Sequence, residues 1–160
     1  MKIHLTETVE RSSKQVWTIL ADEFNDISQW YAPVRRSYEL KDQKRLPGAS
    51  SAGRVCEFSD KPTGLQAHER ILRFDAELGL LEIEVVPKNI AISPLQRNIA
   101  TFRVQSLGPT QSRVELTASP ELKAFGYMLY PMLKMGLTRG FTQLLQSLKQ
   151  HAETTKQKVV

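Results

Sequence analysis

The chain has 160 residues, a length typical of one domain that buries a sizeable core without a disulfide or a bound metal. Its only cysteine, Cys56, excludes an intrachain disulfide and a multi-cysteine metal site, and no stretch approaches the roughly 18 uninterrupted apolar residues that a membrane-spanning helix requires. The formal net charge is +5, and the excess lies in residues 101–160, which hold eight basic and three acidic side chains without the basic run or aromatic platform typical of nucleic-acid binding.

The first ten residues alternate between polar and apolar side chains, with Ile3, Leu5 and Val9 on one face. This period of two predicts a half-buried strand over residues 2–10. The alternation lacks the continuous apolar run of a signal peptide. Together with the single cysteine, it favours the cytoplasm as the compartment of the protein.

Two short helices are predicted after this strand. Ser12 or Ser13 supplies the N-cap of the first helix, and Gln15 follows Ser12 at the spacing of a capping box. We expect this helix to end near Asp22. A second brief turn of helix follows, and Pro33 must stop it because the residue before a proline disfavours the helical conformation.

A run of strands is predicted next, because short alternating segments are separated by turn residues. The predicted strands cover residues 34–41, 54–59, 66–75, 80–87, 99–107 and 113–119. The links AELG and LGPTQS have hairpin length, so the strands that they join are expected to be antiparallel. The longer link KNIAISPLQRN has the length of a flexible flap.

The last predicted element is a helix over residues 125–153, whose side chains separate into two faces at the α-helical period. One face is a stripe of large apolar residues: Leu129, Leu133, Leu137, Phe141, Leu144 and Leu148. The other, the methionine face, consists of Met128, Met132 and Met135, with Arg139 one turn further on. The first half of this helix is apolar almost all round, so we expect it to be enclosed.

Three residues interrupt the helical pattern. Pro131 either kinks the helix or marks its true start. Gly136 and Gly140 offer a surface for the close approach of another element, at some cost in helix propensity.

The order of elements is a strand, short helices, six strands and a long helix, which indicates an α+β fold. An antiparallel sheet with one long terminal helix must bury one face of the sheet under that helix. A strongly curved sheet that grips a helix need not close its core fully, and methionine adapts to irregular surfaces. We therefore predict a cavity beside the methionine face.

Four stretches carry a resemblance to a known family: KQVWTILAD followed by Trp30, the pair Gly53-Arg54, the stretch HERILRFDAELGLLEIEVV and the glycine-containing terminal helix. With these features the chain resembles the SRPBCC/START-like helix-grip superfamily, which includes START domains and Bet v 1-like plant proteins. The bacterial branch of polyketide cyclase/dehydrase-like proteins is closest in pattern. The resemblance departs at Leu81 and Ile83, where the family usually carries an aromatic residue.

The resemblance implies one helix-grip domain over residues 1–150 and a polar tail over residues 151–160. The domain would be a curved antiparallel sheet of six to seven strands around the C-terminal helix, with the two short helices after the first strand. Trp17 is then expected in the core, where it pins the first helix beneath the sheet. Trp30 is expected to close the chain onto the second strand near one end of the cavity.

The resemblance also implies that the cavity between sheet and terminal helix binds a small hydrophobic molecule. The residues expected to contact this ligand are Trp30, Tyr38, Phe58, Phe102, Met128, Met132, Met135 and Arg139. For the aromatic residues and methionines the competing interpretation is ordinary core packing, and for Arg139 it is ordinary exposure.

Four residues are the candidates for catalysis: Glu69, Arg54, Tyr38 and His68. The resemblance places Glu69 on the inward side of its strand, where a buried carboxylate needs a cationic or hydroxyl partner. Arg54, one strand earlier, is the natural partner. The competing interpretation is a structural Arg–Glu pair that ties two strands together without any catalysis.

Several kinds of chemistry are not expected from the sequence. The three histidines lack metal-ligand spacing, and the chain has neither a phosphate loop nor a dinucleotide fingerprint, so we expect no metal and no cofactor. Cys56 lies in a predicted strand and is expected to be a small buried residue rather than a reactive thiol.

Three functions remain open from the sequence. The leading hypothesis is a binding module, rather than an enzyme, for a lipid, isoprenoid, quinone or polyketide-like molecule. The second is a polyketide cyclase/dehydrase-type enzyme that uses Glu69, Arg54 and Tyr38. The third is a module associated with RNA, a ribosome or a respiratory complex, which the basic last third of the chain keeps open; DNA is not expected as a partner.

Overall fold

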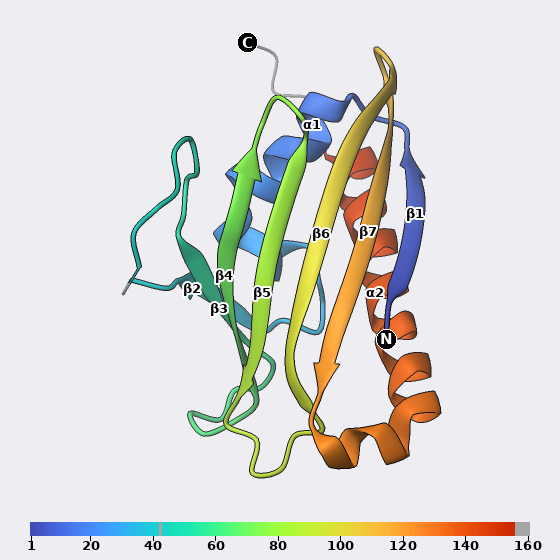
Figure 1. Cartoon of the computed structure of the whole chain (residues 1–160). Coiled ribbons are helices and arrows are strands. Elements are labelled where there is room, and N and C mark those ends of the chain that lie inside the picture. The colour runs from blue at the N-terminus through green and yellow to red at the C-terminus, as the bar shows by residue number, and fades with distance from the viewer. Residues whose placement is uncertain (42, 156–160) are drawn as a thin grey trace.

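The computed structural model describes residues 1–41 and 43–155, and it shows a curved antiparallel sheet with a long helix across one face (Figure 1). The seven strands follow the order β1-β7-β6-β5-β4-β3-β2. Their bounds are β1 (Ile3–Val9), β2 (Arg36–Glu39), β3 (Gly53–Glu57), β4 (Gln66–Asp75), β5 (Leu80–Lys88), β6 (Leu95–Gly108) and β7 (Gln111–Leu122). The predicted helix-grip arrangement is confirmed.

The segment after β1 folds into α1 (Ser13–Trp17), the π-helical turn η1 (Thr18–Asp22) and the 3-10 helix η2 (Phe24–Gln29). Ser12 is the N-cap: its hydroxyl accepts a hydrogen bond from the backbone N–H of Gln15 at 3.2 Å. The Gln15 side chain in turn accepts from the backbone N–H of Ser12 at 3.1 Å. The predicted capping box is therefore present, with Ser12 rather than Ser13 as the cap.

Three strands differ most from their predicted bounds. β6 and β7 are longer, and β7 continues through Pro120, whereas the predicted strand ended at residue 119. β1 pairs with β7 only as far as Ala118, so Pro120 lies at an edge position, where proline is tolerated. β2 is shorter, because a bend at Arg35 separates Val34 from the strand.

The main core lies between the sheet and the elements α1, η1 and α2 (Tyr130–Thr154). Trp17 is only 7% exposed, and its ring meets that of Phe74 edge to face with 5.3 Å between centroids. Such aromatic pairs contribute beyond the apolar area that they bury. From α2, the buried residues are Leu145, Leu148 and Ala152. The expectation that Trp17 is a core residue is confirmed.

The terminal helix begins later than its sequence pattern does. The 3-10 helix η3 (Ala124–Leu129) comes first, and α2 starts with Pro131 in its first turn, where the missing N–H costs no hydrogen bond. Of the two alternatives for Pro131, the start of the helix is the correct one. α2 runs to Thr154, so it includes the first residues of the predicted tail, whereas residues 156–160 of that tail lie outside the described part.

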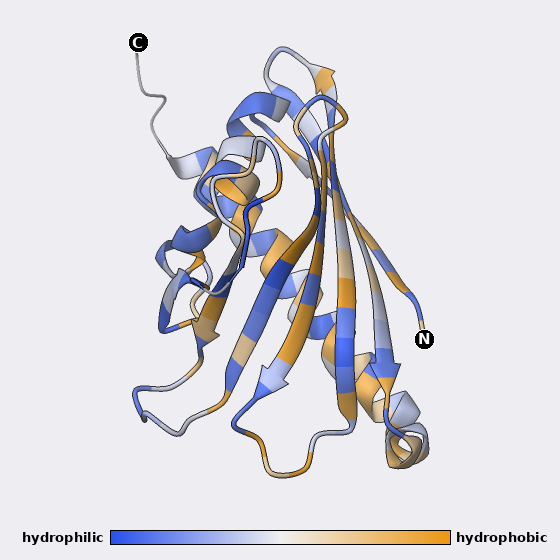
Figure 2. Cartoon of the chain, turned by 60° about the vertical axis from the view of Figure 1, so that its left-hand side comes forward, coloured by the Kyte–Doolittle hydropathy of each residue, from blue (hydrophilic) through white to orange (hydrophobic). Residues whose placement is uncertain are grey.

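The first half of the terminal helix is not enclosed, contrary to the prediction. The large residues of η3 and of the first turns of α2 are mostly exposed, and no residue of α2 before Leu145 is fully buried. Figure 2 shows hydrophobic segments in the loop between β5 and β6 and at the start of this helix, at the same end of the molecule. Within the described residues, no helix has the length and apolar character needed to cross a membrane.

The capping box yields a stability prediction. Replacement of Ser12 by Ala removes the side-chain acceptor of the Gln15 N–H, and we expect the free energy of unfolding to fall by about 1 kcal/mol. Urea denaturation followed by circular dichroism measures this difference. Ser13→Ala is the matched control, because Ser13 lies inside the helix, and its effect should be small. Equal losses in both variants would contradict the assignment of the cap.

Candidate ligand-binding cavity

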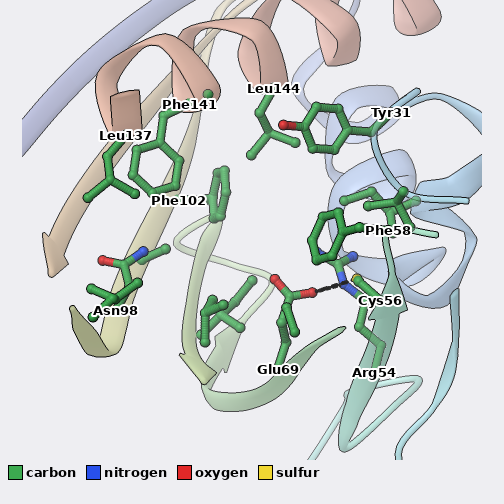
Figure 3. A pocket seen from close by; sticks show the side chains of 18 of the residues that line it. Tyr31, Arg54, Cys56, Phe58, Glu69, Asn98, Phe102, Leu137, Phe141 and Leu144 are labelled. Atoms are coloured by element: carbon green, nitrogen blue, oxygen red, sulfur yellow. Dashed lines mark hydrogen bonds and ion pairs between the residues drawn. The ribbon is translucent and has the colours of Figure 1, made fainter. Parts of the chain in front are cut away.

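A cavity of about 260 Å³ lies between α2 and the inner face of strands β3 to β6 (Figure 3). Its wall is mostly aliphatic and aromatic, with a few polar side chains. The lining residues are Ile27, Tyr31, Val34, Arg54, Cys56, Phe58, Ala67, Glu69, Ile83, Val85, Leu95, Asn98, Ala100, Phe102, Gly136, Leu137, Gly140, Phe141 and Leu144.

Two glycines of α2 help to form this space. Gly136 and Gly140 both line the cavity, and a Cβ atom added at either position would meet nothing within 4 Å. The prediction that these glycines allow another element to approach closely is therefore wrong. They act in the opposite sense, because the side chains that they lack would otherwise project into the open space.

A buried ion pair forms one polar part of the wall. Arg54 on β3 and Glu69 on β4 are direct partners in the antiparallel register, and the Arg54 Nε donates to Glu69 Oε2. The guanidinium also donates from its NH1 group to the Phe24 carbonyl at 2.5 Å and lies over the Phe24 ring at 3.8 Å from its centroid. The Cys56 thiol donates to the same Glu69 oxygen at 3.1 Å.

The charges of this cluster fix its protonation. Burial is the largest single influence on the pKa of Arg54 and would lower it, but the charge of Glu69, the hydrogen bond to Glu69 and the interactions with Cys56 together outweigh burial and raise the pKa, so the guanidinium stays charged. Burial, and after it the charge of Glu69, raises the pKa of the Cys56 thiol well above its ordinary value. Cys56 is buried and stays protonated, so it is no nucleophile at neutral pH, as the sequence indicated.

Asn98 is a second polar group in the wall, and its amide oxygen is unpartnered in the part of the chain that is described. The side chain is 3% exposed, and its Oδ1 is buried without a hydrogen bond to any described residue. The sheet register aligns Asn98 with Val85 and Val85 with Glu69, so Asn98 and Glu69 lie on one row, two strands apart. A buried acceptor without a partner is costly, so Asn98 Oδ1 is a position in the wall where a hydrogen-bond donor would be favourable.

Tyr31 is a third polar group, from the segment that follows η2. Figure 3 shows its ring reaching toward Leu144, with the hydroxyl beside that side chain. Burial, and after it the electrostatic influence of the neighbouring Cys56 and Glu69, raises the pKa of Tyr31, so its phenol is neutral and able both to donate and to accept a hydrogen bond.

Neither Tyr31 nor Asn98 was a candidate from the sequence. The sequence did carry a signal for Asn98. In β6 it alternates with Ala100 and Phe102, so the three side chains face the same, inner side of the sheet. A polar side chain among buried apolar ones indicates a special role. The prediction missed Asn98 by starting that strand at Ile99.

Of the predicted ligand-contacting residues, the structure brings Phe58 and Phe102 to the cavity wall. It does not bring Trp30 there: the Trp30 ring packs beside Tyr31 and stacks on His151, with 6.4 Å between the centroids of each pair. Tyr38 is also misplaced by the prediction. It is 40% exposed on the outer face of β2, where the Arg36 guanidinium lies 5.3 Å from its ring centroid, because the bend at Arg35 breaks the alternation that began at Val34.

The methionine face does not look into the cavity, and that prediction is wrong. Met128 is 86% exposed, and Met132, Met135 and Arg139 are exposed as well. The reason is geometric: the leucine stripe of α2 turns toward the sheet, so the face on the other side of the helix turns toward solvent.

Of the four catalytic candidates, the structure brings Arg54 and Glu69 together at the cavity wall and leaves Tyr38 and His68 outside it. His68 lies on the opposite face of β4 and its Nε2 is 3.2 Å from Gln66 Oε1. Burial, and after it the charge of Lys88, lowers the pKa of His68. In the part of the chain that is described, no group of three or more His, Cys, Asp or Glu side chains is placed to hold a metal ion.

Comparison with known proteins supports a common fold. The model of a family described as "Polyketide cyclase / dehydrase and lipid transport" matches residues 1–153. A search among curated protein sequences found no match. A START superfamily protein from Mycobacterium smegmatis superposes with a TM-score of 0.74 at 14% identity, covering 95% of this chain and 97% of that one.

Two further solved structures with related folds are enzymes by their names. The Zhui aromatase/cyclase from a Streptomyces species has a TM-score of 0.72 at 16% identity, with 96% of this chain and 93% of that chain covered. A truncated norcoclaurine synthase from Thalictrum flavum has a TM-score of 0.66 at 14% identity, with 98% and 95% covered. At such identities these likenesses show the fold alone.

The buried ion pair yields a second prediction. Glu69→Gln leaves the Arg54 charge buried without its counter-charge, so we expect a loss of about 3–5 kcal/mol in the free energy of unfolding, measured by chemical denaturation. The double variant Arg54→Met/Glu69→Leu removes both charges and should recover most of this loss.

The control for this prediction is Glu39→Gln, which breaks the exposed pair between Glu39 and Arg45. Its effect should stay below about 1 kcal/mol. If the double variant were as unstable as Glu69→Gln, the destabilisation would not come from the unpaired charge.

Proposed function

The chain belongs to the family described as polyketide cyclase / dehydrase and lipid transport, and from this premise we propose that its cavity binds a small, largely apolar ligand with a polar group. The observation that carries the proposal is an apolar cavity beneath α2 whose wall contains a buried amide, Asn98, whose oxygen has no partner among the described residues. Pockets for small molecules combine a mostly hydrophobic lining with a few polar groups that orient the ligand.

The size of the cavity limits the ligand. An engineered protein cavity of roughly 150 Å³ holds one benzene ring and stays dry when empty. A space of about 260 Å³ therefore suits a molecule of one or two rings, or an aliphatic group of similar bulk. A long, fully enclosed acyl chain would need more room than this, so the part of a lipid that fits here is limited to a short segment.

The polar groups of the wall limit the chemistry of the ligand. The Asn98 atom without a described partner is the acceptor Oδ1, which is matched by a hydroxyl or N–H donor on the ligand, whereas a carbonyl on the ligand would need a donor such as the Asn98 Nδ2 or the Tyr31 hydroxyl. The neutral Tyr31 phenol lies at another part of the same cavity, near Leu144. We expect a hydroxylated or carbonyl-bearing hydrophobic molecule to bind more tightly than the corresponding hydrocarbon.

A second candidate function is proton transfer within the bound ligand, as in a cyclase or dehydratase. The observation that favours it is the second oxygen of Glu69, Oε1, which points away from Arg54 in Figure 3 and accepts no hydrogen bond from the residues described. Of the residues expected to act in such a reaction, Glu69 and Arg54 remain, and Tyr31 replaces Tyr38. Mass spectrometry of a ligand after incubation separates the two functions, because a carrier returns it unchanged.

The location of the ligand is tested by filling the cavity. Gly140→Leu places a side chain in the open space, so we expect naphthalene binding, followed by NMR titration, to weaken at least about tenfold, while the better helix propensity of leucine keeps the protein at least as stable. Gln143→Leu on the exposed side of the same helix is the control and should bind like the wild type. Undiminished binding to Gly140→Leu would place the naphthalene elsewhere, and no binding to the wild type would remove the proposed function.

The role of Asn98 is tested with a pair of probes. The wild type should bind 2-naphthol roughly tenfold more tightly than naphthalene, because one hydrogen bond to a buried amide contributes on the order of 1 kcal/mol or more. In Asn98→Leu this preference should vanish, while the midpoint of unfolding rises because the amide no longer lacks a partner.

Ser112 provides the control for this test. Its hydroxyl is also buried without a hydrogen bond to the described residues, but it does not line the cavity. Ser112→Ala should therefore leave the preference for 2-naphthol unchanged. Equal binding of both probes by the wild type would show that Asn98 does not recognise the ligand.

A further inference from the structure

Exposed large hydrophobic residues concentrate at one end of the molecule. The six that define this docking surface come from η3, from the start of α2 and from the loop between β5 and β6: Ile90, Ile92, Tyr127, Met128, Met132 and Met135. Ile92 is 74% exposed, and Met128 is more exposed still. An exposed cluster of this kind on a folded chain marks a surface that contacts another apolar phase or a partner.

The two segments of the docking surface are held together. The backbone N–H of Lys123 donates to the Pro94 carbonyl at 2.9 Å, which ties the start of η3 to the end of the β5–β6 loop. Gly126 packs so closely on this loop that a Cβ atom there would lie 2.7 Å from the Pro94 oxygen. Figures 1 and 2 show both segments at the same end of the molecule. Their apolar side chains therefore form one surface on a fixed scaffold.

The charge around the docking surface is positive. No acidic residue occurs in the sequence between Glu121 and Glu153, whereas Lys123, Lys134 and Arg139 lie in this stretch and are exposed. Glu121 itself is neutralised by Arg97, whose Nε lies 2.8 Å from it. The surface thus combines exposed methionine, isoleucine and tyrosine side chains with unopposed cations.

We propose that this end of the molecule docks onto a membrane surface that contains anionic phospholipid. Apolar side chains that enter the boundary between headgroups and acyl chains, flanked by lysine and arginine that attract the anionic headgroups, are the two components of interfacial binding. A protein partner with a matching groove would not require the basic residues, and nucleic acid would not require the apolar ones. The bilayer interface uses both.

The proposal of membrane docking does not rest on a ligand in the cavity. The docking surface and the cavity nevertheless lie next to each other. Leu137 and Leu95 line the cavity, and they lie on α2 and at the start of β6, directly beyond the segments of the docking surface. A hydrophobic molecule dissolved in the bilayer would therefore meet the cavity wall close to the docked end.

The test is co-sedimentation of the full chain with vesicles of phosphatidylcholine alone and of equal parts phosphatidylcholine and phosphatidylglycerol. We expect binding to the anionic vesicles that weakens as salt is added, and weaker binding to the neutral ones. Met128→Ser/Met132→Ser should lower the partition coefficient at least about tenfold. Lys134→Glu/Arg139→Glu should lower it by at least roughly fivefold for each charge changed.

The matched control is Leu107→Ser/Arg113→Glu, which changes an exposed leucine and an exposed arginine near the hairpin between β6 and β7, at the other end of the molecule. Its binding should equal that of the wild type, and circular dichroism should show that all variants are folded.

Three results would contradict the proposal. An absence of binding to anionic vesicles at low salt would overturn it. A concentration-dependent dimer that Met128→Ser/Met132→Ser dissociates, without vesicle binding, would overturn it in favour of a second copy. Binding to polyuridylic acid that only the charge variant loses, again without vesicle binding, would overturn it in favour of RNA.

Discussion

The cavity and the exposed end of the molecule both depend on one constraint: only the C-terminal half of α2 packs tightly against the sheet. Leu145, Leu148 and Ala152 anchor the C-terminal half of this helix in the main core, together with Trp17 and the strands beneath it. The middle of α2 lies over a cavity, and the beginning is exposed to solvent. One amphipathic helix thus has a buried part, a part over the cavity and an exposed part. The cavity is present because the buried side chains of α2 all lie in its C-terminal half. Hydrophobic burial of that end is sufficient to position the rest, since the helix backbone is rigid over this length.

The polar wall of the cavity is built by strand register rather than by any local motif. Arg54, Glu69, Val85 and Asn98 lie on one row across β3, β4, β5 and β6. The two charges of the Arg54–Glu69 pair compensate each other, and the Phe24 carbonyl and the Cys56 thiol add hydrogen bonds to the pair. The Oδ1 of Asn98 has no partner among the described residues. This contrast is why the amide, rather than the ion pair, carries the proposal that the cavity binds a ligand.

The sequence was sufficient for the order of elements, the capping box at Ser12, the core position of Trp17 and the inward side of Glu69. The order of elements and the capping box follow from local spacing and from alternation within single elements, whereas the core position of Trp17 and the inward side of Glu69 followed from the family resemblance. The direction of the methionine face did not follow, because helical periodicity separates two faces without stating which one meets the sheet. The prediction for Tyr38 was wrong because the bend at Arg35 changes which of the following side chains face the inside of the sheet. Asn98 was missed because the predicted start of its strand came a few residues late, and Tyr31 because no periodicity places a loop residue.

Because the buried residues of α2 lie in its C-terminal half, a small rotation about that half moves the rest of the helix by a larger distance. About 27 Å of helix separates the anchored residue Leu148 from Tyr130 at the other end, which η3 joins to the β5–β6 loop, so a pivot of about 5° at the anchor displaces that end and the joined loop by roughly 2 Å. Gly136 and Gly140 lie along this stretch of helix and face open space, so no side chain of theirs resists such a movement. A displacement of the joined end would change the width of the hollow midway along the stretch.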